Sequence, residues 1–264
     1  MQIVNNQNAV AGSEIKHSSM THRHLPLWDK VIFVDWNGVL SRDPFWISIL
    51  KKSSHPLFRS LSDSVGQLFK NNDDLVRSWM RGELKASEVI ATLNVHLDKR
   101  FNHDYLSRAL EKDCGLMRTN AALFNLLKKV QKSSFVILAT DNMDCFVEHI
   151  RRVKNRRAAN SELGDSFETE TLLLSRTVRL FDDVLCSSDL GVLKREDPAR
   201  FFGEWLSEHS FTFKDALLLD DLEINCSIFR SKGGAAIQVT YESLYRELDS
   251  VESKIEAWLL GNHI

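Results

Sequence analysis

The chain has 264 residues, of which 43% are hydrophobic, so it can bury a core in one large domain or two small ones. Its formal net charge is -2, which excludes a strong overall attraction to nucleic acid or to an anionic membrane surface. No segment reaches the roughly 18 apolar residues that a membrane-spanning helix needs, and we expect no membrane partner.

Residues 1–27 are polar and lack the apolar stretch of a secretory signal. We expect a flexible N-terminal arm and a cytoplasmic protein. His17, His22 and His24 lie in this arm without a cysteine or acidic ligand arranged with them, so the pattern favours a tail over a metal cluster. The cysteines are spread without a CxxC pair, which predicts reduced thiols at Cys114, Cys145, Cys186 and Cys226.

Five apolar runs rich in β-branched residues predict strands that are buried on both faces. Helical patterns lie between them, among them one at residues 123–130 after a possible Thr119 cap and one after Pro198. This alternation predicts an α/β fold, a Rossmann-like three-layer core with a parallel sheet, over residues 28–42 and 119–264. The predicted strands are Val31–Val34, Phe135–Ala139, Val184–Cys186, Ala216–Leu219 and Ala235–Val239.

Residues 35–134 separate the first two predicted strands, far more than the roughly 10 to 12 residues that a strand–helix–strand crossover requires. This segment contains helix-like patterns and no convincing strand. We therefore predict a helical insertion domain over residues 43–118, placed above the strand end from which it departs. Its predicted helices are Leu61–Phe69, Leu75–Met80, Ser87–Leu97 and Tyr105–Leu110.

Three later segments have weaker or separate signals. Residues 158–179 show no clean period, so helix and hairpin both stay open there. Residues 244–259 carry apolar side chains at helical spacing, which predicts a helix packed on the sheet. The run RRVKNRR at residues 151–157 is interpreted as a solvated helix face, because one short basic run on a near-neutral chain is weak evidence for a nucleic-acid partner.

Polar side chains follow the apolar runs at the points where the strands would end. In an open parallel sheet, ligands bind beyond the carboxyl ends of the strands. Carboxylates from two strands can hold Mg²⁺ through oxygen ligands, while a hydroxyl and an ammonium group can hold phosphate oxygens. The sequence therefore predicts a site at this edge that is built from Asp35, Thr140, Asp141, Asn142, Lys194, Asp220 and Asp221.

These motifs and their order resemble the haloacid dehalogenase (HAD) superfamily, whose members are mostly Mg²⁺-dependent phosphohydrolases. VIFVDWNGV is similar to the first family motif, an apolar strand followed by Asp, any residue, usually Asp, and Gly. FVILATDN resembles the second motif, Lys194 the third, and LLLDDLEINC the fourth. The order and spacing match over residues 30–240, and the helical insertion lies where the family places its C1-type cap.

The resemblance implies a Mg²⁺-dependent phosphatase that acts on a small phosphorylated metabolite. It implies that Asp35 is the nucleophile, which attacks phosphorus to form an aspartyl phosphate. It also implies that Thr140 and Lys194 hold the phosphoryl group, together with Asp141 and Asn142. The implied metal set is Asp35, Asn37, Asp220 and Asp221, with Asn225 in a supporting position and Gly38 allowing a sharp turn after the nucleophile.

Residue 37 is where the chain departs from this family pattern. The family's phosphatases carry a second aspartate there, which protonates the leaving oxygen and later activates water. Asn37 cannot do this, because an amide exchanges no proton near neutral pH. General acid and base catalysis contributes typically about 10²- to 10⁴-fold, so its loss predicts a slower enzyme while the phosphate site is kept.

Several explanations of Asn37 stay open. The leaving group can be one that needs no protonation, such as an acyl phosphate, or another acid such as Asp43, Asp141 or Glu83 can substitute. Alternatively, the domain binds a phosphorylated ligand without turnover, as a regulatory or interaction module. Family members that cleave carbon–phosphorus or carbon–halogen bonds also lack the second acid, and the former carry a cap lysine, for which the candidates are Lys51, Lys52 and Lys85. Trp36 is a candidate to flank the substrate entrance.

Overall fold

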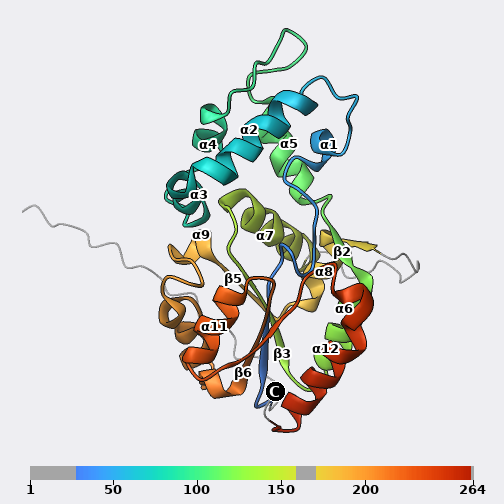
Figure 1. Cartoon of the computed structure of the whole chain (residues 1–264), viewed down its shortest axis with the longest axis vertical. Helices are drawn as coiled ribbons and strands as arrows, with labels where there is room; N and C mark the ends of the chain where they lie inside the picture. The colour runs from blue at the N-terminus through green and yellow to red at the C-terminus, as the bar shows by residue number, and fades with distance from the viewer. Residues whose placement is uncertain (1–27, 159–170, 263–264) are drawn as a thin grey trace, which may run out of the picture.

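The computed structural model describes residues 28–158 and 171–262 (Figure 1). The predicted arm at residues 1–27, with its histidines, lies outside the described residues, as does much of the segment 158–179. None of the described helices is long and apolar enough to cross a membrane. The four cysteines are free and buried.

Five parallel strands form the central sheet: β1 (Val31–Val34), β3 (Phe135–Thr140), β5 (Asp183–Cys186), β6 (Ala216–Asp220) and β7 (Ala235–Gln238). Their order is β5-β3-β1-β6-β7, so β1 lies in the centre, with Val31 opposite Phe135 and Ala216. The three central strands are buried along their whole length, which explains their continuous apolar runs. The predicted α/β class and parallel sheet are confirmed.

Alternate side chains of each strand point to opposite faces of the sheet, and helices cover both faces (Figure 1). On one face Phe33 packs against the rings of Phe202, Trp205 and Phe229. Its neighbour Ile32 belongs to the hydrophobic cluster on the other face. The covering helices are η2 (Ala199–Gly203), α10 (Glu204–Glu208) and α11 (Glu223–Ser231) on the Phe33 face, and α6 (Ala121–Val130), α7 (Asp144–Ala158) and α12 (Leu244–Leu259) on the other.

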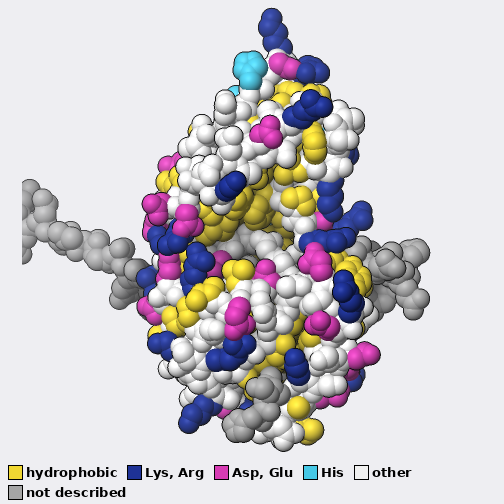
Figure 2. Space-filling model, viewed as in Figure 1, with side chains coloured by type: hydrophobic (Ala, Val, Ile, Leu, Met, Phe, Trp, Pro, Cys, Tyr) yellow, Lys and Arg dark blue, Asp and Glu magenta, His cyan; other side chains and the backbone are white. Residues whose placement is uncertain are grey.

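The insertion that directly follows β1 is helical and lies above the carboxyl ends of the strands (Figure 1). Trp46 and Trp79 are fully buried in it, and we propose that residues 43–118 form the predicted insertion domain. One predicted helix ends earlier than expected, at Thr92, because Leu93 has an extended backbone. The cap helices are α1 (Ile47–Leu50), α2 (Phe58–Asn71), α3 (Asp73–Met80), α4 (Ala86–Thr92) and α5 (Tyr105–Cys114). Figure 2 shows a hollow between these helices and the core, where hydrophobic side chains gather.

Helix α6 begins one residue later than the sequence pattern suggests. The side-chain oxygen of Asn120 accepts hydrogen bonds from the backbone N–H groups of Ala122 (3.0 Å) and Leu123 (3.1 Å). Asn120 is therefore the N-cap, and the predicted Thr119 cap is wrong. The hydroxyl of Thr119 instead lies 2.6 Å from the hydroxyl of Thr177, a partner that is distant along the chain.

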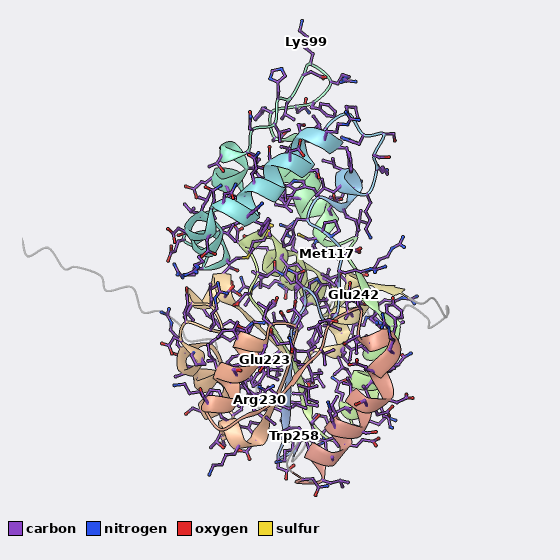
Figure 3. All side chains as sticks on the ribbon, in the orientation of Figure 1. Lys99, Met117, Glu223, Arg230, Glu242 and Trp258 are labelled. Carbon is purple, nitrogen blue, oxygen red and sulfur yellow. The ribbon has the colours of Figure 1, made fainter. Side chains whose placement is uncertain are left out.

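The chain returns from the cap helices through Met117 (Figure 3) and the short strand β2 (Arg118–Asn120). This strand pairs antiparallel with β4 (Thr171–Leu173). Because β4 pairs with a distant segment, the open segment 158–179 forms no hairpin between its own described residues. Its remaining described part is helical. The other short elements are α8 (Leu174–Thr177), η1 (Val178–Leu180), α9 (Ser187–Leu190) and η3 (Phe213–Asp215).

Candidate active site

Three carboxylates meet at the carboxyl edge of the sheet. Asp35 directly follows β1, and its backbone N–H donates to the carbonyl of Leu219 in β6 (2.9 Å), which continues the parallel pairing. Asp220 ends β6, and Asp221 follows it. One oxygen of each of these three aspartates lies within 4.8 Å of the others, and within the described part of the chain this is the one such group of candidate metal ligands.

Lys194 contacts this acidic group and is only 2% exposed. Its Nζ lies 3.1 Å from Oδ2 of Asp35 and donates to Oδ2 of Asp220 at 2.5 Å. A second hydrogen bond from Nζ reaches the carbonyl of Ala139 at 3.3 Å. The backbone N–H of Lys194 donates to Oδ1 of Asp141 (3.0 Å), so Asp141 positions the loop that carries the lysine.

Burial changes the protonation of the acidic group. Burial raises the pKa of Asp35 to about 8, where Lys194 opposes the rise and the charges of Asp220 and Asp221 add to it. Burial also raises the pKa of Asp221. Burial lowers the pKa of Lys194, but the neighbouring carboxylates raise it more, so that Lys194 stays an ammonium ion.

The acidic group fits Mg²⁺ by charge and by donor type. Three carboxylates face one ammonium group, so two negative charges are uncompensated when all of them are ionised. Carboxylate oxygens are hard ligands of the kind that Mg²⁺ prefers. A divalent cation would balance the two charges and would favour the ionised form of Asp35.

Asp220 is held by more contacts than its neighbours. Its Oδ1 accepts hydrogen bonds from the backbone N–H of Leu222 (2.9 Å) and from Nδ2 of Asn225 (3.0 Å). Its Oδ2 is occupied by Lys194. Asp220 therefore holds the Lys194 ammonium group, and the Asn225 amide in turn holds Asp220.

Gly38 shapes the turn that follows Asp35. Its φ of 80° lies in the left-handed region, which confirms the predicted sharp turn. Its carbonyl accepts a hydrogen bond from the N–H of Tyr241 at 2.5 Å. A Cβ at residue 38 would lie 2.5 Å from Cγ of Asp221, so only glycine leaves that carboxylate in place.

Two buried donors at the end of β3 lack a hydrogen-bond partner among the described residues, namely Oγ1 of Thr140 and Nδ2 of Asn142. The Asn142 side chain is oriented by its Oδ1, which accepts from the N–H of Met143 (3.0 Å). Its backbone N–H donates to Oγ of Ser187 (2.9 Å). Buried polar groups are rarely left unpaired, and the acceptor oxygens of a phosphate group would satisfy both donors.

Asn37 lies partly buried on the turn after Asp35, where it forms an isolated bridge with Ser41. Asp43, one predicted substitute for the missing acid, is already engaged on both oxygens. Lys51 pairs with its Oδ1, and the N–H of Arg118 donates to its Oδ2 at 2.7 Å. Asp43 therefore ties the two linkers between core and cap helices.

Glu83, another predicted substitute, and the candidate cap lysines Lys52 and Lys85 are exposed or in ion pairs. The Glu83 side chain is 53% exposed and pairs with Arg81 at 3.4 Å. Lys85 lies 3.8 Å from Asp144 at the start of α7. Lys52 is exposed. The structure thus brings together the predicted strand-end residues and leaves these side chains on the surrounding surface or in ion pairs.

Sequence reasoning missed the contacts that dock the cap helices on the site. Oγ of Ser187 donates to the carbonyl of Met80 at the end of α3 (2.6 Å). Arg81 donates twice to the carboxylate of Glu196, at 2.9 and 2.5 Å. Glu196 also accepts from the N–H of Leu193 (3.2 Å), next to the buried lysine. These partners are far apart along the chain, and no local pattern marks them.

Trp36 does not flank an entrance, and that prediction is wrong. The side chain is fully buried and packs against Phe146 of α7, with ring centroids 5.3 Å apart. A large apolar ring gains more from burial than from exposure at a rim.

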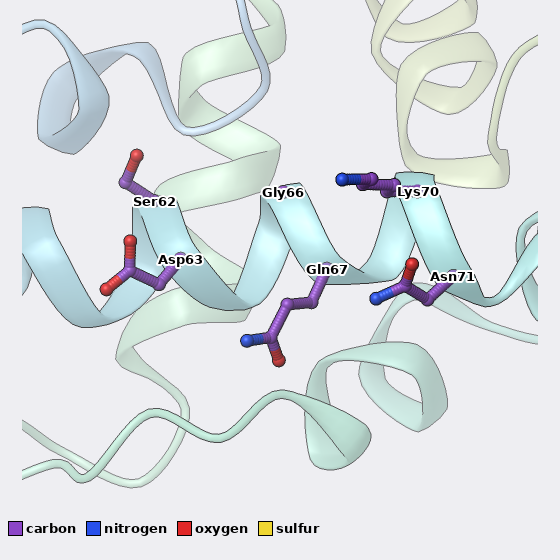
Figure 4. A pocket seen from close by; sticks show the side chains of 6 residues that line it. All are labelled: Ser62, Asp63, Gly66, Gln67, Lys70 and Asn71. Atoms are coloured by element: carbon purple, nitrogen blue, oxygen red, sulfur yellow. The ribbon is translucent and has the colours of Figure 1, made fainter.

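A separate hollow of about 440 Å³ lies along α2 (Figure 4), far from these residues in the chain. It is lined by one helix alone and includes none of the acidic group.

Comparisons with known proteins agree on the fold. No family model and no curated protein sequence matches the chain. A HAD family enzyme from Bacteroides thetaiotaomicron, solved in complex with magnesium and inorganic phosphate, is 17% identical with a TM-score of 0.52, and the match covers 82% of this chain and 99% of that one.

Two further structures give a similar result. A predicted HAD-like family hydrolase from Porphyromonas gingivalis is 13% identical with a TM-score of 0.54, and the match covers 86% of this chain and 97% of that one. The L-2-haloacid dehalogenase from Xanthobacter autotrophicus is 13% identical with a TM-score of 0.52, over 84% of this chain and 82% of that one. The chain therefore has a HAD-like fold, as the resemblance of its four motifs predicts.

Proposed function

We propose that this protein is a Mg²⁺-dependent hydrolase of the HAD type, a phosphatase that acts on a small phosphorylated metabolite. The observation that carries the proposal is the contact of buried Lys194 with Asp35 and Asp220 inside a group of three carboxylates. Buried like charges are costly, so a core built only for stability has no use for them. A phosphoryl group needs this combination of positive charge and hydrogen-bond donors.

Asp35 is the proposed nucleophile. Its carboxylate oxygen bonds to phosphorus, the bond from phosphorus to the leaving oxygen breaks, and the leaving group departs with the electron pair. Water then attacks the phosphorus of the aspartyl phosphate, which releases phosphate and restores the carboxylate. Mg²⁺, held by Asp35 and Asp221 with Asn37 as a further oxygen ligand, would supply positive charge for the phosphoryl oxygens.

The other site residues bind and orient the phosphoryl group in this proposal. Lys194 neutralises its negative charge while restraining Asp35. Thr140 and Asn142 donate to its oxygens with the two buried groups that lack a partner in the described residues. Asp141 holds the lysine loop through its hydrogen bond to the backbone of Lys194.

A second candidate function follows from Asn37, because its amide cannot donate a proton as the aspartate at this place in the family motif does. In this alternative the domain binds Mg²⁺ and a phosphorylated ligand without turnover and serves as a regulatory or interaction module.

Phosphate release from purified protein tests the proposal. With Mg²⁺ and a panel that contains acyl phosphates and phosphoesters, we expect turnover that chelation of the metal removes. Asp35→Asn should remove the activity, whereas the matched control Asp29→Asn, at an exposed acid just before β1, should leave it unchanged. Equal activity in Asp35→Asn would end the assignment. Tight binding of Mg²⁺ and phosphate with no turnover on the whole panel would favour the binding module.

A further inference from the structure

The turn after Asp35 offers the leaving group no proton. Asn37 occupies that turn, and its amide does not titrate near neutral pH. Asp43, farther along the same segment, has both carboxylate oxygens engaged by Lys51 and by the N–H of Arg118. Asp43 therefore holds together the two linkers between the core and the cap helices and is not available as an acid.

Of the two acids near the end of β3, Asp141 is engaged by the lysine loop and Asp144 is only partly engaged. Asp141 accepts the backbone N–H of Lys194 and faces the lysine loop. Asp144 begins α7, where its side chain is 15% exposed and lies 3.8 Å from Lys85. Its Oδ1 is buried and has no hydrogen-bond partner among the described residues. An experiment therefore has to test whether Asp144 protonates the leaving group in place of residue 37.

We propose, building on the function proposed above, that the substrate is an acyl phosphate, the mixed anhydride of a carboxylic acid and phosphoric acid. In the first step a bond forms between a carboxylate oxygen of Asp35 and phosphorus. The bond between phosphorus and the acyl oxygen breaks, and its electron pair stays on that oxygen. The product is a carboxylate, a stable anion at neutral pH that needs no proton.

The second step also balances without a protein acid. Water adds to phosphorus, the bond from phosphorus to Asp35 breaks, and the proton of the water passes to solvent. An alkyl phosphate differs in the first step only, because its leaving group is an alkoxide, a strong base that requires a proton as it departs. The site therefore selects substrates by the basicity of the leaving group.

A series of leaving groups tests this selection. We would measure kcat/KM of the full chain with Mg²⁺ on acetyl phosphate, on aryl phosphates ordered by the acidity of their phenols, and on glycerol phosphate. We expect kcat/KM to fall steeply as the leaving group becomes more basic, with acetyl phosphate at least about 10²-fold above glycerol phosphate. Asn37→Asp should lower the ratio of kcat/KM on acetyl phosphate to kcat/KM on glycerol phosphate by about 10²- to 10⁴-fold. Asp144→Asn should leave this ratio of kcat/KM values unchanged.

The contrary outcomes are distinct. Equal rates along the series would overturn the leaving-group inference and leave the phosphatase proposal standing. Loss of glycerol phosphate turnover in Asp144→Asn would identify Asp144 as the acid and would also overturn the inference. The inference would fail as well if the wild type were inactive on acetyl phosphate and the Asn37→Asp variant hydrolysed it. If neither protein hydrolyses any substrate, while both unfold at the same temperature, the phosphatase proposal itself fails.

Discussion

Replacing Gly38 by alanine should weaken Mg²⁺ binding by an amount that can be measured separately from its effect on the free energy of unfolding. Gly38 has a φ of 80°, and a Cβ there would lie 2.5 Å from Cγ of Asp221. Ordinary van der Waals contact begins at 3.4 Å, so the Asp221 carboxylate has to move away from the turn. Metal–ligand distances tolerate only about 0.2 Å of change. The Gly38→Ala variant should therefore lose Asp221 as a metal ligand.

The magnitude follows from two contributions. A left-handed backbone costs a non-glycine residue about 1–2 kcal/mol, which lowers the free energy of unfolding without touching the site. Displacing a carboxylate near the metal is expected to weaken Mg²⁺ binding by at least about 10- to 100-fold, the range seen when supporting groups of metal sites are mutated. The two contributions can be measured apart.

The assay is Mg²⁺ binding by calorimetry, together with urea denaturation of the metal-free protein. The matched control is Gly233→Ala, because Gly233 also has positive φ (94°) but its Cβ would meet nothing closer than 4.0 Å, the Cγ of Lys214. Both variants should lose similar stability, and only Gly38→Ala should lose Mg²⁺ affinity. Equal Mg²⁺ affinity in the two variants would refute the placement of Asp221 at the metal.

Other changes probe the remaining parts of the site and the core. Lys194→Met removes the buried ammonium, and phosphate release should fall at least about 10²-fold in steady-state assays. The raised pKa of Asp35, about 8 against an ordinary 3.8, means that the metal-free fold holds an extra proton, so its thermal stability in chelator should fall as pH rises from about 4 to about 8. Asp35→Asn should make that profile shallower, with the raised pKa values of Asp141 and Asp221 accounting for the rest. Arg81→Ala, which removes the two hydrogen bonds to Glu196, should raise KM several-fold with little change in urea stability. Phe33→Ala should lower the free energy of unfolding by about 3–5 kcal/mol in urea.

The central sheet and the strand-end residues could be predicted because each depends on a local signal. A strand buried on both faces must be apolar throughout, so Val31–Val34 and Ala216–Leu219 are visible as runs. Parallel strands carry their carboxyl ends to one edge, and Asp35 and Asp220 lie near each other because β1 pairs directly with β6. The group within 4.8 Å is the consequence of that topology.

The rest depends on partners that local sequence does not encode. Arg81 and Glu196 look like ordinary surface charges until the fold places them 2.5 Å apart. The pairing of β2 with β4 joins two three-residue strands, too short for a period to appear. Trp36 lies beside the nucleophile position in sequence, but its ring is buried against Phe146, so proximity along the chain gave the wrong surroundings.

Mass spectrometry of the protein after brief reaction with acetyl phosphate and Mg²⁺ tests the central claim most directly. Quenched in acid and digested, the chain should carry one phosphoryl group per molecule, on the peptide that contains Asp35, and none when Mg²⁺ is withheld. A phosphoryl group on any other residue, or hydrolysis of acetyl phosphate that leaves Asp35 unmodified at every time point, would contradict the proposed nucleophile.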